Sequence, residues 1–88
     1  MTKVLTTKDE AKVSRPLYII ANEIKKDWQK VYFGAVPYLD AMYQLDKISD
    51  NYGCDSAKSI VAYFLCNASQ WKGDKAREIK KELNKMIK

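Results

Sequence analysis

The sequence predicts an all-α fold: a compact bundle of about four helices with short connections and a polar N-terminal arm. Three observations support this. A chain of 88 residues is long enough for one domain at most. Four segments repeat apolar residues at the three- and four-residue spacing of a helix. The most strand-like segment, residues 31–36, is too short to pair alone. We therefore expect residues 1–14 to form a flexible arm and residues 15–88 a single helical domain.

The first helix is predicted to begin at Ser14-Arg15-Pro16, because proline suits the first turn of a helix. Gly34 interrupts its apolar pattern. The second helix is predicted to open at Pro37 and to run to about Ile48, followed by a turn in the Asp-Asn-Tyr-Gly segment, residues 50–53. The predicted buried positions are Leu17, Ile20, Ala21, Ile24 and Trp28 in the first helix, and Leu39, Met42 and Leu45 in the second.

The third helix, capped by Asp55 or Ser56, shows two stripes. One stripe is apolar and predicts a core face: Ala57, Ile60, Val61, Phe64, Leu65 and Ala68. The other consists of small residues and is a candidate surface for self-association: Ser59, Ala62, Cys66 and Ser69. Small residues allow close approach by a neighbouring element. The pattern is that of a central helix, and a homodimer seam would look the same.

The fourth helix is predicted to follow a turn at residues 70–73 and to be capped by Asp74. Its expected core face is Ala76, Ile79, Leu83, Met86 and Ile87. The opposite face carries a basic ridge, Arg77, Lys81 and Lys85, which is a candidate surface for nucleic acid or for an acidic protein, or else an ordinary solvated face. A helix-turn-helix that reads bases is poorly supported, because this helix offers no Asn, Gln, Ser or Thr before Asn84.

Aromatic residues gather around Gly34. Tyr32, Phe33 and Tyr38 form a candidate partner-binding loop, because exposed aromatic side chains are typical of binding hot spots. The alternative is that they pack the first helix against the second. Other aromatic residues are expected in or near the core: Trp28, Tyr43, Phe64 and Trp71.

The composition argues against catalysis. Histidine is absent, which excludes Ser–His and Cys–His mechanisms and every histidine metal site. The acids that bracket the turn at residues 50–53 lack the spacing of a calcium-binding loop, and the glycines are too far apart for a phosphate-cradling loop. A lone-cysteine mechanism at Cys54, at the start of the third helix, is the remaining alternative. We expect no enzyme activity, no catalytic residue, no metal and no cofactor.

Charge is unevenly distributed along the chain. The net charge is +5, and residues 72–88 hold seven basic and three acidic side chains, whereas residues 34–55 hold one basic and four acidic. The longest apolar run, residues 60–66, is far shorter than the roughly 20 residues that span a bilayer. No segment resembles a signal peptide. A cytoplasmic location is therefore expected, with no membrane partner.

Most of the chain, from Pro16 to Met86, resembles short uncharacterised proteins of bacteriophages, prophages and mobile elements. The most distinctive segments are YFGAVPYLDAM and the Asn-Ala-x-x-Trp-Lys-Gly-x-x-Ala-Arg-x-Ile-Lys segment at residues 67–80. The resemblance implies an accessory product that acts inside the bacterial host. It implies no catalytic residue.

Together these observations predict a non-enzymatic binder of a host or phage macromolecule, such as an inhibitor of host machinery or defence. The partner is expected to be a protein, which contacts the aromatic loop while the basic ridge steers the encounter. One alternative is a nucleic-acid-binding protein that uses the basic ridge, and a second is a virion or assembly component.

Overall fold

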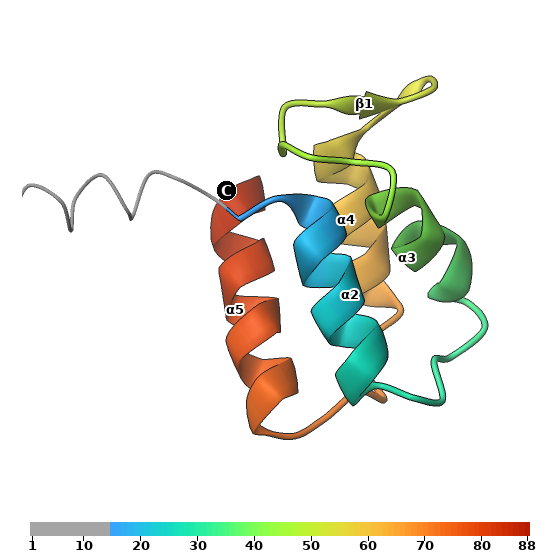
Figure 1. The fold of residues 1–88 in the computed structure, drawn as a ribbon, viewed down its shortest axis with the longest axis vertical. Helices are drawn as coiled ribbons and strands as arrows, with labels where there is room; N and C mark the ends of the chain where they lie inside the picture. Colours follow the sequence, from blue (N-terminus) through green and yellow to red (C-terminus); the bar gives the residue numbers. More distant parts are fainter. Residues whose placement is uncertain (1–14) are drawn as a thin grey trace, which may run out of the picture.

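The fold is described for residues 15–88 in a computed structural model. Within that range the chain forms four helices and one small sheet, in the order α2 (Leu17–Asp27), α3 (Val36–Met42), β1 (Asn51–Tyr52), β2 (Asp55–Ser56), α4 (Ala57–Cys66) and α5 (Asp74–Ile87) (Figure 1). The prediction of a compact, mostly helical fold with four helices is confirmed. The predicted arm, residues 1–14, lies outside the described residues.

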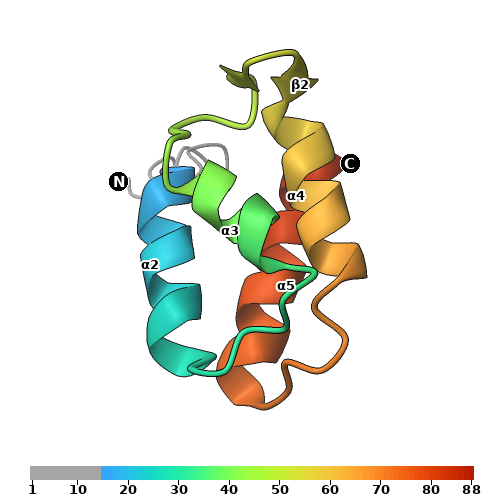
Figure 2. The same ribbon diagram turned by 90° about the vertical axis from the view of Figure 1, so that its right-hand side faces the viewer.

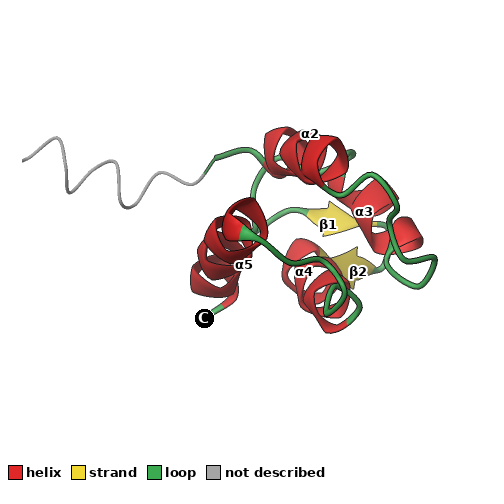
Figure 3. Cartoon of the chain, turned by 90° about the horizontal axis from the view of Figure 1, so that it is seen from below, coloured by secondary structure: helices red, strands yellow, loops and turns green. Residues whose placement is uncertain are grey.

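The three longer helices run along one direction of the molecule. α2 and α5 are antiparallel neighbours, and α4 packs against α5 (Figure 1). The short helix α3 packs against both α2 and α4 (Figure 2). Seen from below, α3 and α5 lie on opposite sides of the α2–α4 pair (Figure 3). All four helices contribute exposed side chains to the outer surface.

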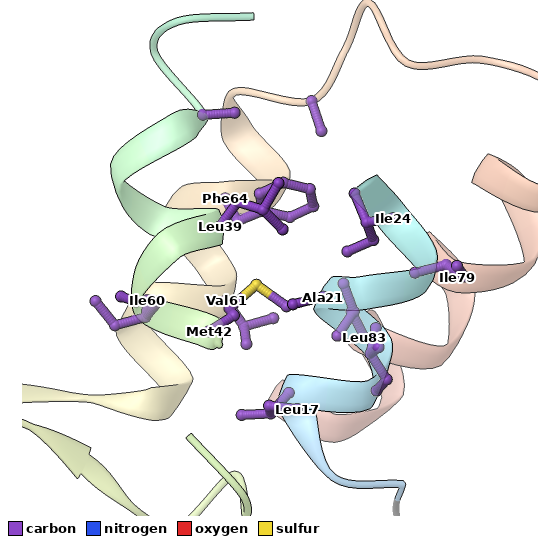
Figure 4. Packing of buried hydrophobic residues seen from close by; sticks show 14 of the residues in the cluster. Leu17, Ala21, Ile24, Leu39, Met42, Ile60, Val61, Phe64, Ile79 and Leu83 are labelled. Atoms are coloured by element: carbon purple, nitrogen blue, oxygen red, sulfur yellow. The ribbon is translucent and has the colours of Figure 1, made fainter. Parts of the chain in front are cut away.

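The core lies between the four helices (Figure 4). The apolar stripes predicted from the sequence point into it: every predicted core position of α2, α3 and α4 is buried except Leu65, which is partly buried. Burial of these stripes is the main favourable term in folding. Three predicted core aromatics are buried as well, namely Trp28, Phe64 and Trp71. Tyr43, Met86 and Ile87 are partly buried at the edge of the core.

The prediction of an all-α fold is wrong in one detail, the hairpin at residues 51–56. β1 and β2 pair antiparallel, with Asn51 opposite Ser56 and Tyr52 opposite Asp55. Gly53 begins the two-residue turn with a φ of 62°, a conformation that glycine adopts without strain. The sequence predicted the turn at residues 50–53, whereas Asn51 and Tyr52 form β1 and the turn consists of Gly53 and Cys54. Strands of two residues are too short to show an alternating pattern, so the pairing was missed.

The predicted second helix is also too long, because α3 ends at Met42 rather than near Ile48. The backbone of the segment that follows α3 caps the first turn of α2. The first-turn amides of Leu17 and Tyr18 donate to the carbonyls of Asp46 and Leu45, at 2.8 and 3.0 Å. Pro16, which precedes α2, has no side chain that could accept these bonds. The segment after α3 supplies the missing cap.

The two predicted N-caps had different outcomes. Ser56 caps α4, since its hydroxyl accepts a hydrogen bond from the Ser59 amide at 3.1 Å. Asp74 does not cap α5. It is the first residue of that helix, where its carboxylate pairs with Arg77, and Gly73 occupies the cap position with a φ of 117°. A positive φ at this position favours glycine over aspartate.

An ion cluster joins the start of α2 to α5. The Arg15 guanidinium donates to Glu23 at 2.6 Å and to both carboxylate oxygens of Glu82, at 3.0 and 2.7 Å. These side chains are 31–38% exposed, so solvent screens the attraction. The hydrogen bond from Arg15 lowers the pKa of Glu23 below its ordinary value.

Replacement of Arg15 by methionine is expected to lower the free energy of unfolding at pH 7 by about 1 kcal/mol, the upper range for exposed pairs. Because the pKa of Glu23 is depressed in the folded state, the stabilisation is complete above the ordinary glutamate value of 4.5 and is lost as the pH falls through the lower folded value. Urea unfolding at pH 7 and pH 3 measures this. The Arg77→Met control breaks a far more exposed pair and is expected to change little. A difference between wild type and Arg15→Met that stays the same at both pH values would contradict the argument.

Candidate interaction surfaces

Of the predicted aromatic loop, Tyr32 and Phe33 lie between α2 and α3, whereas Tyr38 lies in α3. Phe33 has 79% of its surface exposed, the largest value among the large apolar residues of the described range. Tyr32 and Tyr38 are partly buried against the core. The rings of Tyr32 and Phe33 are 4.8 Å apart. The loop therefore both packs against the fold and presents one bare aromatic ring to solvent, and partner binding through it stays a prediction.

Gly34 allows this loop to fold closely. A Cβ atom at Gly34 would lie 2.6 Å from Cε2 of Tyr32 and 2.9 Å from Oδ1 of Asn67, distances that no side chain tolerates without movement. The Asn67 side chain is in turn held by a hydrogen bond from its Nδ2 to the Tyr63 carbonyl, at 2.9 Å. The glycine thus lets the Tyr32 ring pack next to the C-terminal end of α4.

Two further exposed residues belong to this surface. Tyr63, on α4, is 52% exposed, and its ring lies 5.5 Å from that of Tyr38. Val36, the first residue of α3, is 38% exposed. We name Tyr32, Phe33, Val36, Tyr38 and Tyr63 the aromatic face. Sequence reasoning missed Tyr63, although an aromatic residue that falls outside both stripes of α4 was a usable signal.

The helices that carry the aromatic face have few charges. α3 and α4 hold two charged residues among 17, Asp40 and Lys58, whereas α2 and α5 hold 12 among 25. Charged residues are depleted at the centres of protein interfaces, and aromatic residues are enriched there. The molecule thus has one weakly charged aromatic side and one strongly charged side.

The small-residue stripe lies on the outer surface of α4. Cys66 and Ser69 are exposed, and Ser59 and Ala62 are partly buried. Ser69 follows the end of the helix. The Ser59 hydroxyl is engaged with Ser56 at 3.0 Å. Self-association through this stripe stays a prediction.

The basic ridge lies on the exposed side of α5, with Arg77, Lys81 and Lys85 all facing solvent. Acidic residues interrupt it. Arg77 pairs with Asp74, and a hollow of about 440 Å³ is lined by Asp74, Glu78, Arg77 and Lys81. The two acidic and two basic side chains that line this hollow have no net charge. The N-terminal half of the ridge is therefore a weaker attractant for a polyanion than its basic residues alone indicate.

The described residues hold no arrangement of three or more His, Cys, Asp or Glu side chains that could bind a metal ion. Both cysteines, Cys54 and Cys66, are free and exposed. None of the helices in residues 15–88 is long and apolar enough to cross a membrane. No protein-family model, curated protein or solved structure matches the chain.

Proposed function

We propose that this chain is a non-enzymatic binding protein whose aromatic face docks on an acidic protein with an apolar groove. The observation that carries the proposal is the 79% exposure of Phe33 next to helices that hold only two charged residues among 17. A bare aromatic ring costs free energy in water, and burial in a partner's groove recovers it. The resemblance to phage and mobile-element proteins favours a partner in the bacterial cytoplasm, either a host protein or a phage protein.

The net charge of +5 favours an acidic partner. The excess positive charge of the helices lies on α5, which holds five basic and three acidic side chains, whereas α2 holds two of each. Charge that lies outside a contact accelerates encounter and leaves the contact itself apolar. Tyr38 and Tyr63 add hydroxyl groups that can donate to acceptors at the rim of the groove.

The double variant Phe33→Ala/Tyr63→Ala is expected to reduce capture of the partner at least about tenfold, because each aromatic anchor of an interface contributes roughly 1–4 kcal/mol. The measurement is capture of the partner by the immobilised protein from host-cell and infected-cell extracts, and one half of each extract is treated with nuclease. The affinity of each variant is then measured with the purified partner. Circular dichroism checks that helicity is unchanged.

The matched control is Tyr18→Ala/Ile19→Ala, which removes two exposed apolar side chains at the opposite end of α2 from the aromatic loop. It is expected to keep full capture. Equal loss in both double variants, or capture that survives loss of Phe33 and Tyr63, would refute the aromatic face as the docking surface.

Nucleic-acid binding through Arg77, Lys81 and Lys85 is the second candidate, favoured by their exposure along one side of α5. Binding of this type weakens steeply as salt rises, because counterions released from the backbone drive it. Capture that disappears after nuclease treatment, together with gel retardation at low salt, would support this candidate in place of the protein partner.

A further inference from the structure

A hollow of about 230 Å³ opens where the α4–α5 turn enters α5. Its lining residues are Trp71, Lys72, Gly73, Ala76, Arg77 and Lys80. Three of the six are cationic and none is acidic. The volume falls below the roughly 300–1,000 Å³ of pockets for drug-sized molecules, which restricts the hollow to a small ligand.

Lys80 is held in place at this hollow. Its Nζ donates to the Trp71 carbonyl at 2.7 Å and lies 5.9 Å from the centre of the Trp71 ring. Partial burial lowers the pKa of Lys80, and the nearby charge of Lys72 lowers it further. Among the ion pairs in residues 15–88, none includes Lys72 or Lys80. Two like charges thus lie near each other without a carboxylate to offset them.

The wall behind Lys80 is rigid. Trp71 is 2% exposed and stacks on Trp28, with ring centres 5.7 Å apart and planes 8° from parallel. Its indole N–H donates to Asp27 Oδ2 at 2.8 Å. The ammonium that rests on this ring is therefore positioned before any ligand arrives, which reduces the entropic cost of binding.

Two neighbouring hollows differ in charge. One is lined by Asp74, Arg77, Glu78 and Lys81, and the other by Glu23, Lys26, Asp27 and Lys75. Each has two acids and two bases. Of the three, the hollow beside Trp71 alone has an uncompensated positive charge, and the ligand that complements it is an anion.

We propose that this hollow binds a small phosphate-bearing ligand through Lys72 and Lys80, with Arg77, which already pairs with Asp74, as a third lining cation. Lysine ammonium groups bind phosphate oxygens as point charges, and the arginine guanidinium adds paired donors. The ammonium groups of Lys72 and Lys80, which form no ion pair in residues 15–88, match a group that carries more than one negative charge, such as pyrophosphate or the terminal phosphates of a nucleotide. The hollow shares no residue with the aromatic face, so a negative result for phosphate binding leaves the proposed protein docking unaffected.

The test uses tryptophan fluorescence, because Trp71 forms one wall of the hollow. Titration with pyrophosphate is expected to give a saturable change. Lys72→Gln and Lys80→Gln are each expected to weaken binding about tenfold, the effect of losing one charged hydrogen bond. Lys81→Gln removes the same charge from the same helix but does not line this hollow, and less than a twofold effect is expected. Lys72 is exposed, so its variant reports on binding even where Lys80→Gln disturbs the packing of Trp71.

Nucleoside diphosphate and single-stranded oligonucleotide, titrated in parallel, distinguish the sources of the phosphate. Pyrophosphate and the diphosphate binding with the same dependence on Lys72 would support the proposal. No saturable change with pyrophosphate, equal weakening by Lys81→Gln, or binding of the oligonucleotide alone would overturn it, because each of these points to bulk charge or to no site.

Discussion

Replacement of Phe64 by alanine is expected to lower the free energy of unfolding by about 3–5 kcal/mol. Phe64 is fully buried and contacts two tryptophans edge-on, with ring centres 6.2 Å from Trp28 and 6.5 Å from Trp71. Its removal leaves a cavity where α4 meets the turn before α5. Since single domains are stable by only about 5–15 kcal/mol, and short chains lie at the low end, we expect a large fraction of this variant to be unfolded at 25 °C.

The matched control is the adjacent residue on α4, Tyr63, which is 52% exposed. Tyr63→Ala is expected to change stability by less than about 1 kcal/mol, as substitutions at exposed positions usually do. Urea unfolding followed by circular dichroism compares the two. Similar losses for Phe64→Ala and Tyr63→Ala would contradict the assignment of one residue to the core and the other to the aromatic face.

Replacement of Trp71 by alanine is the second large effect, with an expected loss of about 3–5 kcal/mol. The Trp71 side chain joins three parts of the fold: it stacks on Trp28, meets Phe64 edge-on, and donates a hydrogen bond to Asp27 at the end of α2. Its carbonyl and ring also hold Lys80. Loss of the indole therefore loosens the attachment of the turn to both α2 and α5.

Graded variants separate these contributions. Trp71→Phe keeps an aromatic ring and loses the indole N–H, so an intermediate loss of about 1.5–3 kcal/mol is expected, typical for a hydrogen bond to a charged group. Asp27→Asn keeps a hydrogen-bond acceptor for the indole N–H, and a smaller loss of unfolding free energy is expected. Thermal and urea unfolding measure the free energy of unfolding of each variant. If Trp71→Phe proves as damaging as Trp71→Ala, the aromatic ring does not contribute to the attachment of this turn, which contradicts the role assigned to stacking.

The candidate surfaces were only partly predictable. Exposure of Phe33 followed from its place beside Gly34 in a loop, and the basic ridge followed from helical periodicity on α5. The contribution of Tyr63 required the packing of α3 against α4, which places its ring beside Tyr38. The hollow beside Trp71 could not be predicted from the sequence either, because Lys72 lies in the turn before α5 and Lys80 lies two helical turns further on.

Local spacing in the chain was enough to predict which helices form and which face each one buries. Leu17 and Ile20 in α2, like Ile79 and Leu83 in α5, recur with the period of the helix, and burial of that stripe is the dominant favourable force. The capping of α2 and the ion pairing between α2 and α5 depend on packing between segments that are distant in the sequence. The carbonyls of Leu45 and Asp46, beyond the end of α3, cap α2, and Arg15 meets Glu82 across 67 residues of chain. Helical periodicity reports only on neighbours three or four positions apart, so contacts of this kind leave no mark in it.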